Sequence, residues 1–218
     1  MRPVRMSIVF MLCATPSFAQ EHRAFVTGSG GFAVGPDGAA GNVLGELGVR
    51  IAPNLFVVGD FGQFRNLQPA VLQPAIDQAV GSLAVDGLNV VGTPTEPAWY
   101  SLGGVRYQMP ARGAVLPYVF GGVGFARLTP TAQFTYSNGT GVLAITPTEG
   151  QDVTTGIVSS GFFTQPAPEN ALMFAIGGGL AIPVAPHLAV ETDYRFSRID
   201  STSPIVVQSL TFGLGYRF

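Results

Sequence analysis

The chain has 218 residues, of which 47% are hydrophobic and 11% charged, with a formal net charge of −2 and a mean hydropathy of +0.36. Every basic residue is arginine, and the acidic residues outnumber them. This balance argues against nucleic-acid binding, which relies on a basic surface to neutralise phosphates. The apolar content is unusually high for a soluble domain.

The first 19 residues have the order of a secretory signal peptide. Arg2 and Arg5 precede a short apolar stretch, and the small residues Ser17 and Ala19 occupy the positions that a signal peptidase recognises before its cleavage site. The stretch is too short for a transmembrane helix, which needs about 20 residues. We expect cleavage after Ala19 and a single-domain mature protein of residues 20–218. The alternative is an uncleaved amphipathic N-terminus.

Eight segments of the mature chain alternate apolar with polar or small residues, which is typical of β-strands with one apolar face. They are Arg23–Val34, Asn42–Ala52, Leu55–Asn66, Ala98–Met109, Val115–Leu128, Ala171–Ile182, Leu188–Ile199 and Ile205–Phe218. Each is close to the ~9–11 residues that a tilted strand needs to cross a membrane.

The connections between these segments fall into short and long classes. The expected turns are Pro53-Asn54, Pro110–Ala114 and Pro183–His187, and the expected outer connections are Gly35–Gly41, Leu67–Pro97, Thr129–Asn170 and Asp200–Pro204. Short turns on one side and longer loops on the other are the pattern of outer-membrane barrels. The sequence therefore predicts an all-β fold, an antiparallel transmembrane β-barrel of eight strands with short periplasmic turns and long extracellular loops.

The two longest loops contain further local structure. Gln133–Tyr136 and Val142–Ile145 flank a Ser-Asn-Gly-Thr-Gly turn, which is a hairpin pattern. Ten barrel strands are therefore possible, but we interpret this hairpin as a ribbon that protrudes above the membrane. In the Leu67–Pro97 loop, Ile76–Leu83 is a candidate short helix.

The last nine residues, Leu210 to Phe218, alternate most regularly. Apolar or aromatic side chains occupy every second position, ending with Phe212, Leu214, Tyr216 and Phe218, and small or polar residues lie between them. This pattern predicts a final strand with one lipid-facing and one interior face.

Charged residues within the strands share the parity opposite to the apolar face. They are Glu46, Arg50, Asp60, Arg106, Glu191, Asp193, Arg195 and Arg217. An arginine that faces lipid at mid-membrane costs ~2–4 kcal/mol, so we expect these side chains to point inward. The interior of an eight-stranded barrel is just wide enough for side chains to fill it, so opposite charges should pair there. The network is then a structural core or, alternatively, the wall of a narrow or gated pore.

Three further arginines, Arg65, Arg127 and Arg198, lie at the outer ends of strands. The outer loops carry acidic residues and no arginine. Arginine binds phosphate well, so we hypothesise that these three side chains contact lipopolysaccharide, with ordinary solvated rim arginines as the alternative. The acidic loops have no ligand spacing that predicts a metal site.

The sequence predicts no catalytic, cofactor or metal site. Its two histidines, His22 and His187, both fall at the periplasmic end, where outer-leaflet chemistry does not take place. Glu191 and Asp193 lie on one strand face, but the neighbouring Arg195 favours an ion-pair cluster over a catalytic acid pair. The glycine runs precede no helix, so they lack the context of a nucleotide-binding loop.

Four segments carry a resemblance to a known family: the signal ending Ser17-Phe18-Ala19, Pro117–Arg127 (PYVFGGVGFAR), Val190–Arg198 (VETDYRFSR) and the terminal LTFGLGYRF. With them, the chain resembles the eight-stranded outer-membrane barrels of the opacity proteins and the OmpA transmembrane domain. The resemblance implies location in a bacterial outer membrane and contact with its lipid and lipopolysaccharide. It also implies recognition by the barrel-assembly machinery through Phe212, Leu214, Tyr216 and Phe218. A lumenal network of Glu46, Arg106, Glu191 and Arg217 is a further implication.

These observations favour a non-enzymatic outer-membrane protein whose barrel is a structural anchor and whose long loops bind a surface ligand or host protein. A porin-like passive channel for small or hydrophobic solutes is the alternative. In that version the apolar Leu67–Pro97 loop, with Val71, Leu72, Ile76, Val80 and Leu83, lines an entrance. A soluble periplasmic carrier resembling a lipocalin is a third reading, against which the terminal aromatic strand argues.

Overall fold

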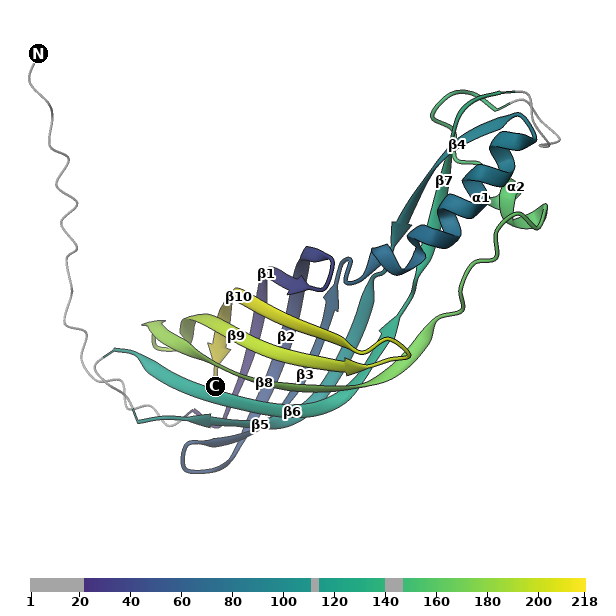
Figure 1. The fold of residues 1–218 in the computed structure, drawn as a ribbon. Coiled ribbons are helices and arrows are strands. Elements are labelled where there is room, and N and C mark those ends of the chain that lie inside the picture. The colour runs from purple at the N-terminus through teal and green to yellow at the C-terminus, as the bar shows by residue number, and fades with distance from the viewer. Residues whose placement is uncertain (1–21, 111–113, 140–146) are drawn as a thin grey trace, which may run out of the picture.

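Eight strands form a closed antiparallel barrel in the computed structural model, which describes residues 22–110, 114–139 and 147–218. The strands are β1 (Ala24–Gly35), β2 (Gly38–Ala52), β3 (Leu55–Phe64), β5 (Ala98–Gln108), β6 (Leu116–Leu128), β8 (Glu169–Ala185), β9 (Leu188–Asp200) and β10 (Ile205–Arg217). Their order around the barrel is β1-β10-β9-β8-β6-β5-β3-β2 (Figure 1). The eight-stranded barrel expected from the sequence is confirmed.

Alternating burial along each strand separates an interior face from an apolar exterior. In β10, Thr211 and Arg217 are buried, whereas Phe212, Leu214 and Tyr216 are exposed. The barrel closes where β10 pairs with β1, from Phe25 opposite Arg217 to Val34 opposite Gln208. The exposed apolar wall accounts for the high hydropathy of the sequence, because a barrel buries its polar backbone in the ladder and presents its side chains to lipid.

Two connections are tighter than expected. Pairing of β1 with β2 continues to Gly35 opposite Gly38, so the loop predicted over Gly35–Gly41 is a turn of Pro36 and Asp37. That prediction was wrong because residues 38–41 are glycine and alanine, whose small side chains give no visible alternation. Gly38 has a φ of +121°, which explains glycine at the corner. Likewise β8 runs to Ala185, and only Pro186 and His187 separate it from β9.

The two long loops fold together into a module beyond one end of the barrel, as Figure 1 shows. Its elements are η1 (Pro69–Leu72), α1 (Gln73–Val85), β4 (Leu88–Thr95), β7 (Thr131–Gly139) and α2 (Thr154–Ser159). The expected helix is present and longer than predicted. A ribbon that includes Gln133–Tyr136 also protrudes: β7 pairs with β4, and Val142–Ile145, the expected hairpin partner, lies outside the described residues.

The β4–β7 ribbon continues the β5–β6 hairpin out of the barrel. Ala98 lies opposite Leu128 in the wall, and Thr95 lies opposite Thr131 in the ribbon, which is the same register. Between them, the Thr129 amide donates to the Pro97 carbonyl over 3.0 Å. The ladder therefore passes from the barrel into the module without a slip.

The module has a hydrophobic cluster separate from that of the barrel. Its buried members are Leu72, Ile76, Ala79, Leu83, Leu88, Val90, Ala132, Phe134, Tyr136, Val153, Ile157 and Phe163. They come from α1, one face of the ribbon and the segment around α2, so residues from both loops share one core. Among the described residues, no helix is long and apolar enough to cross a membrane.

Candidate functional site

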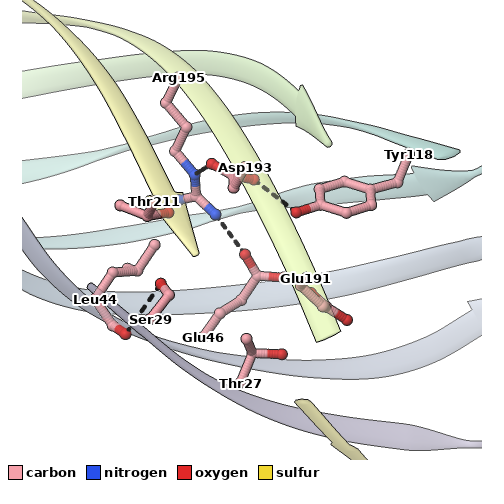
Figure 2. Close-up of a pocket in the computed structure, with 9 residues that line it drawn as sticks. All are labelled: Thr27, Ser29, Leu44, Glu46, Tyr118, Glu191, Asp193, Arg195 and Thr211. Atoms are coloured by element: carbon pink, nitrogen blue, oxygen red, sulfur yellow. Dashed lines mark hydrogen bonds and ion pairs between the residues drawn. The ribbon is translucent and has the colours of Figure 1, made fainter. Parts of the chain in front are cut away.

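The barrel interior holds a buried network of charged side chains. Seven of the eight residues predicted there, all except Arg50, have side chains that are 0–9% exposed and meet in one cluster. They are contributed by β2, β3, β5, β9 and β10, and several appear in Figure 2. Alternation of side chains along each strand brings them inward, and the closed barrel brings distant strands together.

Arg106 is one of two centres of this network. Its Nη1 donates to Glu46 Oε1 over 2.8 Å and to Glu191 Oε2 over 3.0 Å. Glu191 Oε1 accepts a bond from Arg217 Nη2 over 3.2 Å. The Arg106 guanidinium also lies 3.5 Å from the ring centroid of Tyr118, a cation–π contact.

Arg195 is the other centre. Its Nε donates to Asp193 Oδ1 over 2.6 Å, its Nη2 to Glu46 Oε2 over 2.5 Å, and its Nη1 to Asp60 Oδ2. Since Glu46 binds both Arg195 and Arg106, the two centres form one network. Each carboxylate therefore has a guanidinium partner, as a buried charge requires.

A small cavity lies beside these side chains. A cavity of about 10 Å³ is lined by Thr27, Ser29, Leu44, Glu46, Tyr118, Glu191, Asp193, Arg195 and Thr211 (Figure 2). That volume is about the size needed for one water molecule. The hydroxyls of Thr27 and Thr211 are buried and have no protein partner among the described residues, so they suit such a water.

Arg50 has the predicted parity but a different environment. It lies four residues beyond Glu46, toward the short-turn end of β2, and is half-buried. The structure therefore places it outside the cluster around Arg106 and Arg195.

The sequence reading missed the aromatic part of the lumen. Tyr118 Oη donates to Asp193 Oδ2 over 2.9 Å, and the ring of Phe120 lies 4.2 Å from the Arg195 guanidinium. Both rings face glycines: a Cβ on Gly179 would lie 2.6 Å from Tyr118 Oη. The alternation of Tyr118 and Phe120 with Val119 was the available signal, together with the glycine run on β8.

The three rim arginines are exposed and lie on separate parts of the barrel edge. Arg198 Nε donates to Asp200 Oδ1 over 2.7 Å, in a pair whose side chains are 56% and 41% exposed. Arg127 lies opposite Trp99 on the neighbouring strand, and the Arg65 side chain lies close to Gly41. The structure does not gather them into one cluster.

The two histidines do come together, at the short-turn end. Their ring centroids are 5.8 Å apart, and His187 Nδ1 donates to the Arg217 carbonyl over 2.8 Å. Burial lowers the pKa of His22, and the nearby Arg217 and His187 lower it further. The His187 ring also stacks on Tyr216 of β10, so both histidines lie beside the β1–β10 pair that closes the barrel.

At the opposite end, Glu96 lies where the ribbon joins the barrel. Burial raises the pKa of this carboxyl to about 7, and Asp37 and Glu169 add to the shift. Glu96 Oε2 is buried without a hydrogen-bond partner among the described residues. No group of three or more metal-ligating side chains that could hold an ion occurs in the part of the chain that the structure describes.

The comparisons with known proteins agree with this architecture. A family model described as outer membrane protein beta-barrel domain matches residues 6–218. Neisserial surface protein A is 12% identical with a TM-score of 0.53, covering 89% of this chain and 96% of that one. A major outer membrane protein of Thermus thermophilus is 14% identical with a TM-score of 0.53, covering 91% and 100%.

The attachment invasion locus protein Ail of Yersinia pestis is 16% identical with a TM-score of 0.46, covering 89% of this chain and 97% of that one. At their identities, the likeness to Neisserial surface protein A and to the Thermus protein shows the fold alone. No match was found among curated proteins.

Proposed function

We propose that this chain, which belongs to the outer membrane protein beta-barrel domain family, is a bacterial surface protein whose barrel anchors a preformed interaction module. The working surface is the module built from the two long loops. The barrel holds that module at the outer face of the membrane, and its interior is a structural core.

The observation that carries the proposal is the second hydrophobic cluster outside the barrel. Loops that only connect strands are exposed and mobile. Here, by contrast, Ile76, Leu83, Phe134 and Ile157 are at most 1% exposed, and they come from both loops. A surface that is folded before it meets a ligand loses less conformational entropy on binding.

The lumenal network supports the anchoring role. Arg106 and Arg195 each lie across the interior with carboxylate partners from two or more strands, and they cross-link β2, β3, β5 and β9. A solute path needs space beside these groups, and the cavity there is about the size of one water molecule.

The geometry also allows the two long loops to be removed while the barrel stays closed. The Leu67 amide bonds to the Glu96 carbonyl, and Leu128 lies opposite Glu169, so each loop begins and ends on neighbouring chain segments. Residues 67–96 and 129–168 can therefore each be replaced by a short glycine-containing turn without opening the barrel. The full-length and module-less proteins would be displayed on a non-adherent bacterium and compared for binding to cultured cells and immobilised matrix proteins.

We expect binding by bacteria with the full-length protein and background binding with the module-less barrel. Equal surface levels, checked by labelling of an extracellular tag in the β9–β10 turn, exclude a difference in assembly. Equal binding by the two strains would refute the module as the working surface.

A further inference from the structure

One edge of the β4–β7 ribbon is covered by the chain itself. The backbone groups of Ala132, Phe134 and Tyr136 in β7 all bond away from β4, over 2.6–3.0 Å. Their partners are Gln165 for Ala132, Thr154 and Val153 for Phe134, and Gln151 and Gly150 for Tyr136. The β7 edge is thus closed to further pairing.

The opposite edge, on β4, is open. An antiparallel ladder alternates between bonded and non-bonded pairs. Since Ala132, Phe134 and Tyr136 point away from β4, their register partners Pro94, Gly92 and Val90 point away from β7. The free edge therefore offers the amides of Val90 and Gly92 and the carbonyls of all three. Within the described residues, nothing bonds to these groups.

The sequence of β4 agrees with this orientation. Proline has no amide hydrogen, so in a sheet it is placed where that hydrogen would face outward. Pro94 occupies such a position, opposite Ala132. The β4 edge borders the module on the side away from α2 in Figure 1.

The open edge lies above the end of β3. In the barrel wall β3 pairs with β5, from Leu55 opposite Tyr107 to Phe64 opposite Ala98. The Leu67 amide adds one more contact, to the Glu96 carbonyl, and the chain then turns into η1. Above Leu67 no strand of the described residues pairs with this edge of the eight-residue β4. An extended peptide that adds to such an edge gains main-chain hydrogen bonds.

Charge indicates what kind of peptide fits. The loops over residues 67–97 and 129–170 contain no lysine, arginine or histidine, and their acidic residues are Asp77, Asp86, Glu96, Glu149, Asp152 and Glu169. Asp86 precedes β4 and Glu96 follows it, so the open edge has an acidic residue at each end. A second copy of this chain would bring like charges together across the edge, which is unfavourable.

We propose that the free edge of β4 binds an extended, cationic segment of a partner protein as an added strand. This inference rests on the proposed function, because it names the docking site within the interaction module. Main-chain bonds come from Val90, Gly92 and Pro94, and the exposed carboxylate of Asp86 selects a basic side chain at one end of the added strand.

The test uses full-length protein refolded in lipid nanodiscs and a labelled peptide of alternating threonine and valine with an arginine at each end. Fluorescence polarisation measures affinity, and amide hydrogen exchange followed by NMR reports the site. One control peptide carries glutamate at both ends. A second is methylated on alternate backbone nitrogens, which removes the hydrogen bonds along one edge. Asp86→Asn is compared with Glu149→Gln, an equal change of charge beyond the covered β7 edge.

We expect the arginine peptide to bind at least tenfold more tightly than the glutamate peptide and to slow exchange at Val90 and Gly92. The amides of Val91 and Thr93, which face β7, should be protected before the peptide is added. Asp86→Asn should weaken binding severalfold and Glu149→Gln should not.

Three results would overturn the inference. One is binding without added protection at Val90 and Gly92, and another is equal binding of the arginine peptide and its methylated form. The third is protection of both amides without peptide in a particle containing two copies, which would assign the edge to self-association. The proposed function is judged separately, because module-dependent adhesion with no peptide binding would leave it standing and reject only this docking site.

Discussion

Replacing Arg195 with methionine tests the role of the lumenal network most directly. Arg195 is 4% exposed and binds Asp193, Asp60 and Glu46, so the methionine leaves three buried carboxylates without this partner. Removing one member of a buried ion pair destabilises a protein by about 3–5 kcal/mol. At about 1.4 kcal/mol for each factor of ten, the folding equilibrium constant should fall by two to more than three orders of magnitude.

Arg198→Met is the matched control. It lies on the same strand, and it pairs with Asp200 two residues away as Arg195 does with Asp193, but its pair is exposed. Exposed pairs contribute about 0–1 kcal/mol. Unfolding by guanidinium in lipid vesicles can be followed through the fluorescence of Trp99, the single tryptophan, which lies on the outer wall.

Equal losses of stability in Arg195→Met and Arg198→Met would refute the assignment of the network as the barrel core. A large loss in Arg195→Met alone, with the same far-UV circular dichroism in the absence of denaturant, is the expected result.

Three other predictions concern conduction, pH and lipid. Planar bilayers containing the refolded protein of residues 20–218 should show no discrete conductance steps, and Arg195→Met should introduce them by loosening the interior; steps in the wild type would favour the channel alternative. Because the pKa of Glu96 is raised to about 7 from an ordinary value near 4.5, this group favours the fold below pH ~4.5 and loses that contribution as the pH rises through 7. Thermal unfolding of the wild type should therefore shift to lower temperature between pH 5 and 8, and Glu96→Gln should remove part of the shift. Joint replacement of Arg65, Arg127 and Arg198 by alanine should lower the lipopolysaccharide that co-purifies with the protein, and an unchanged amount would reject the proposed contact.

The sequence contained most of the information about the barrel. Period-two alternation located every wall strand to within a few residues, because a strand with one face to lipid has a strict polarity requirement. The alternation did not locate the start of β2 after the β1–β2 turn, because residues 38–41 are glycine and alanine and do not alternate in polarity.

The module was harder to predict for a physical reason. The residues of β4 and β7 that pair are about 40 positions apart, and each strand lies next to a proline that mimics a loop boundary. Gln133–Tyr136 has a local hairpin partner in the sequence, but the helix α1 buries Ile76 and Leu83 against the β4–β7 face and fixes the long-range pairing. The local sequence pattern does not indicate whether Gln133–Tyr136 takes a nearby hairpin partner or the distant strand β4.

The charged site was predicted better than its aromatic surroundings. The position of a charged residue in the two-residue alternation is enough to assign it to the barrel interior, since the exterior faces lipid. Arg50 has the same parity as Glu46, yet it lies near the end of β2 and is only half-buried. Tyr118 and Phe120 were missed because apolar rings satisfy either face of a barrel strand, and only the glycines opposite them indicate which face they occupy.

The unbroken ladder between the ribbon and the barrel has a mechanical consequence. Hydrogen bonds in an antiparallel ladder run perpendicular to the strands, so a pull on the ribbon along its length loads in shear the bonds that join β5 to β3 and β6 to β8. The bond from Thr129 to Pro97 keeps the two pulled strands paired at the junction. A bacterium held by this module under flow would thus transmit tension into the barrel wall as a whole rather than peel the loops away one bond at a time.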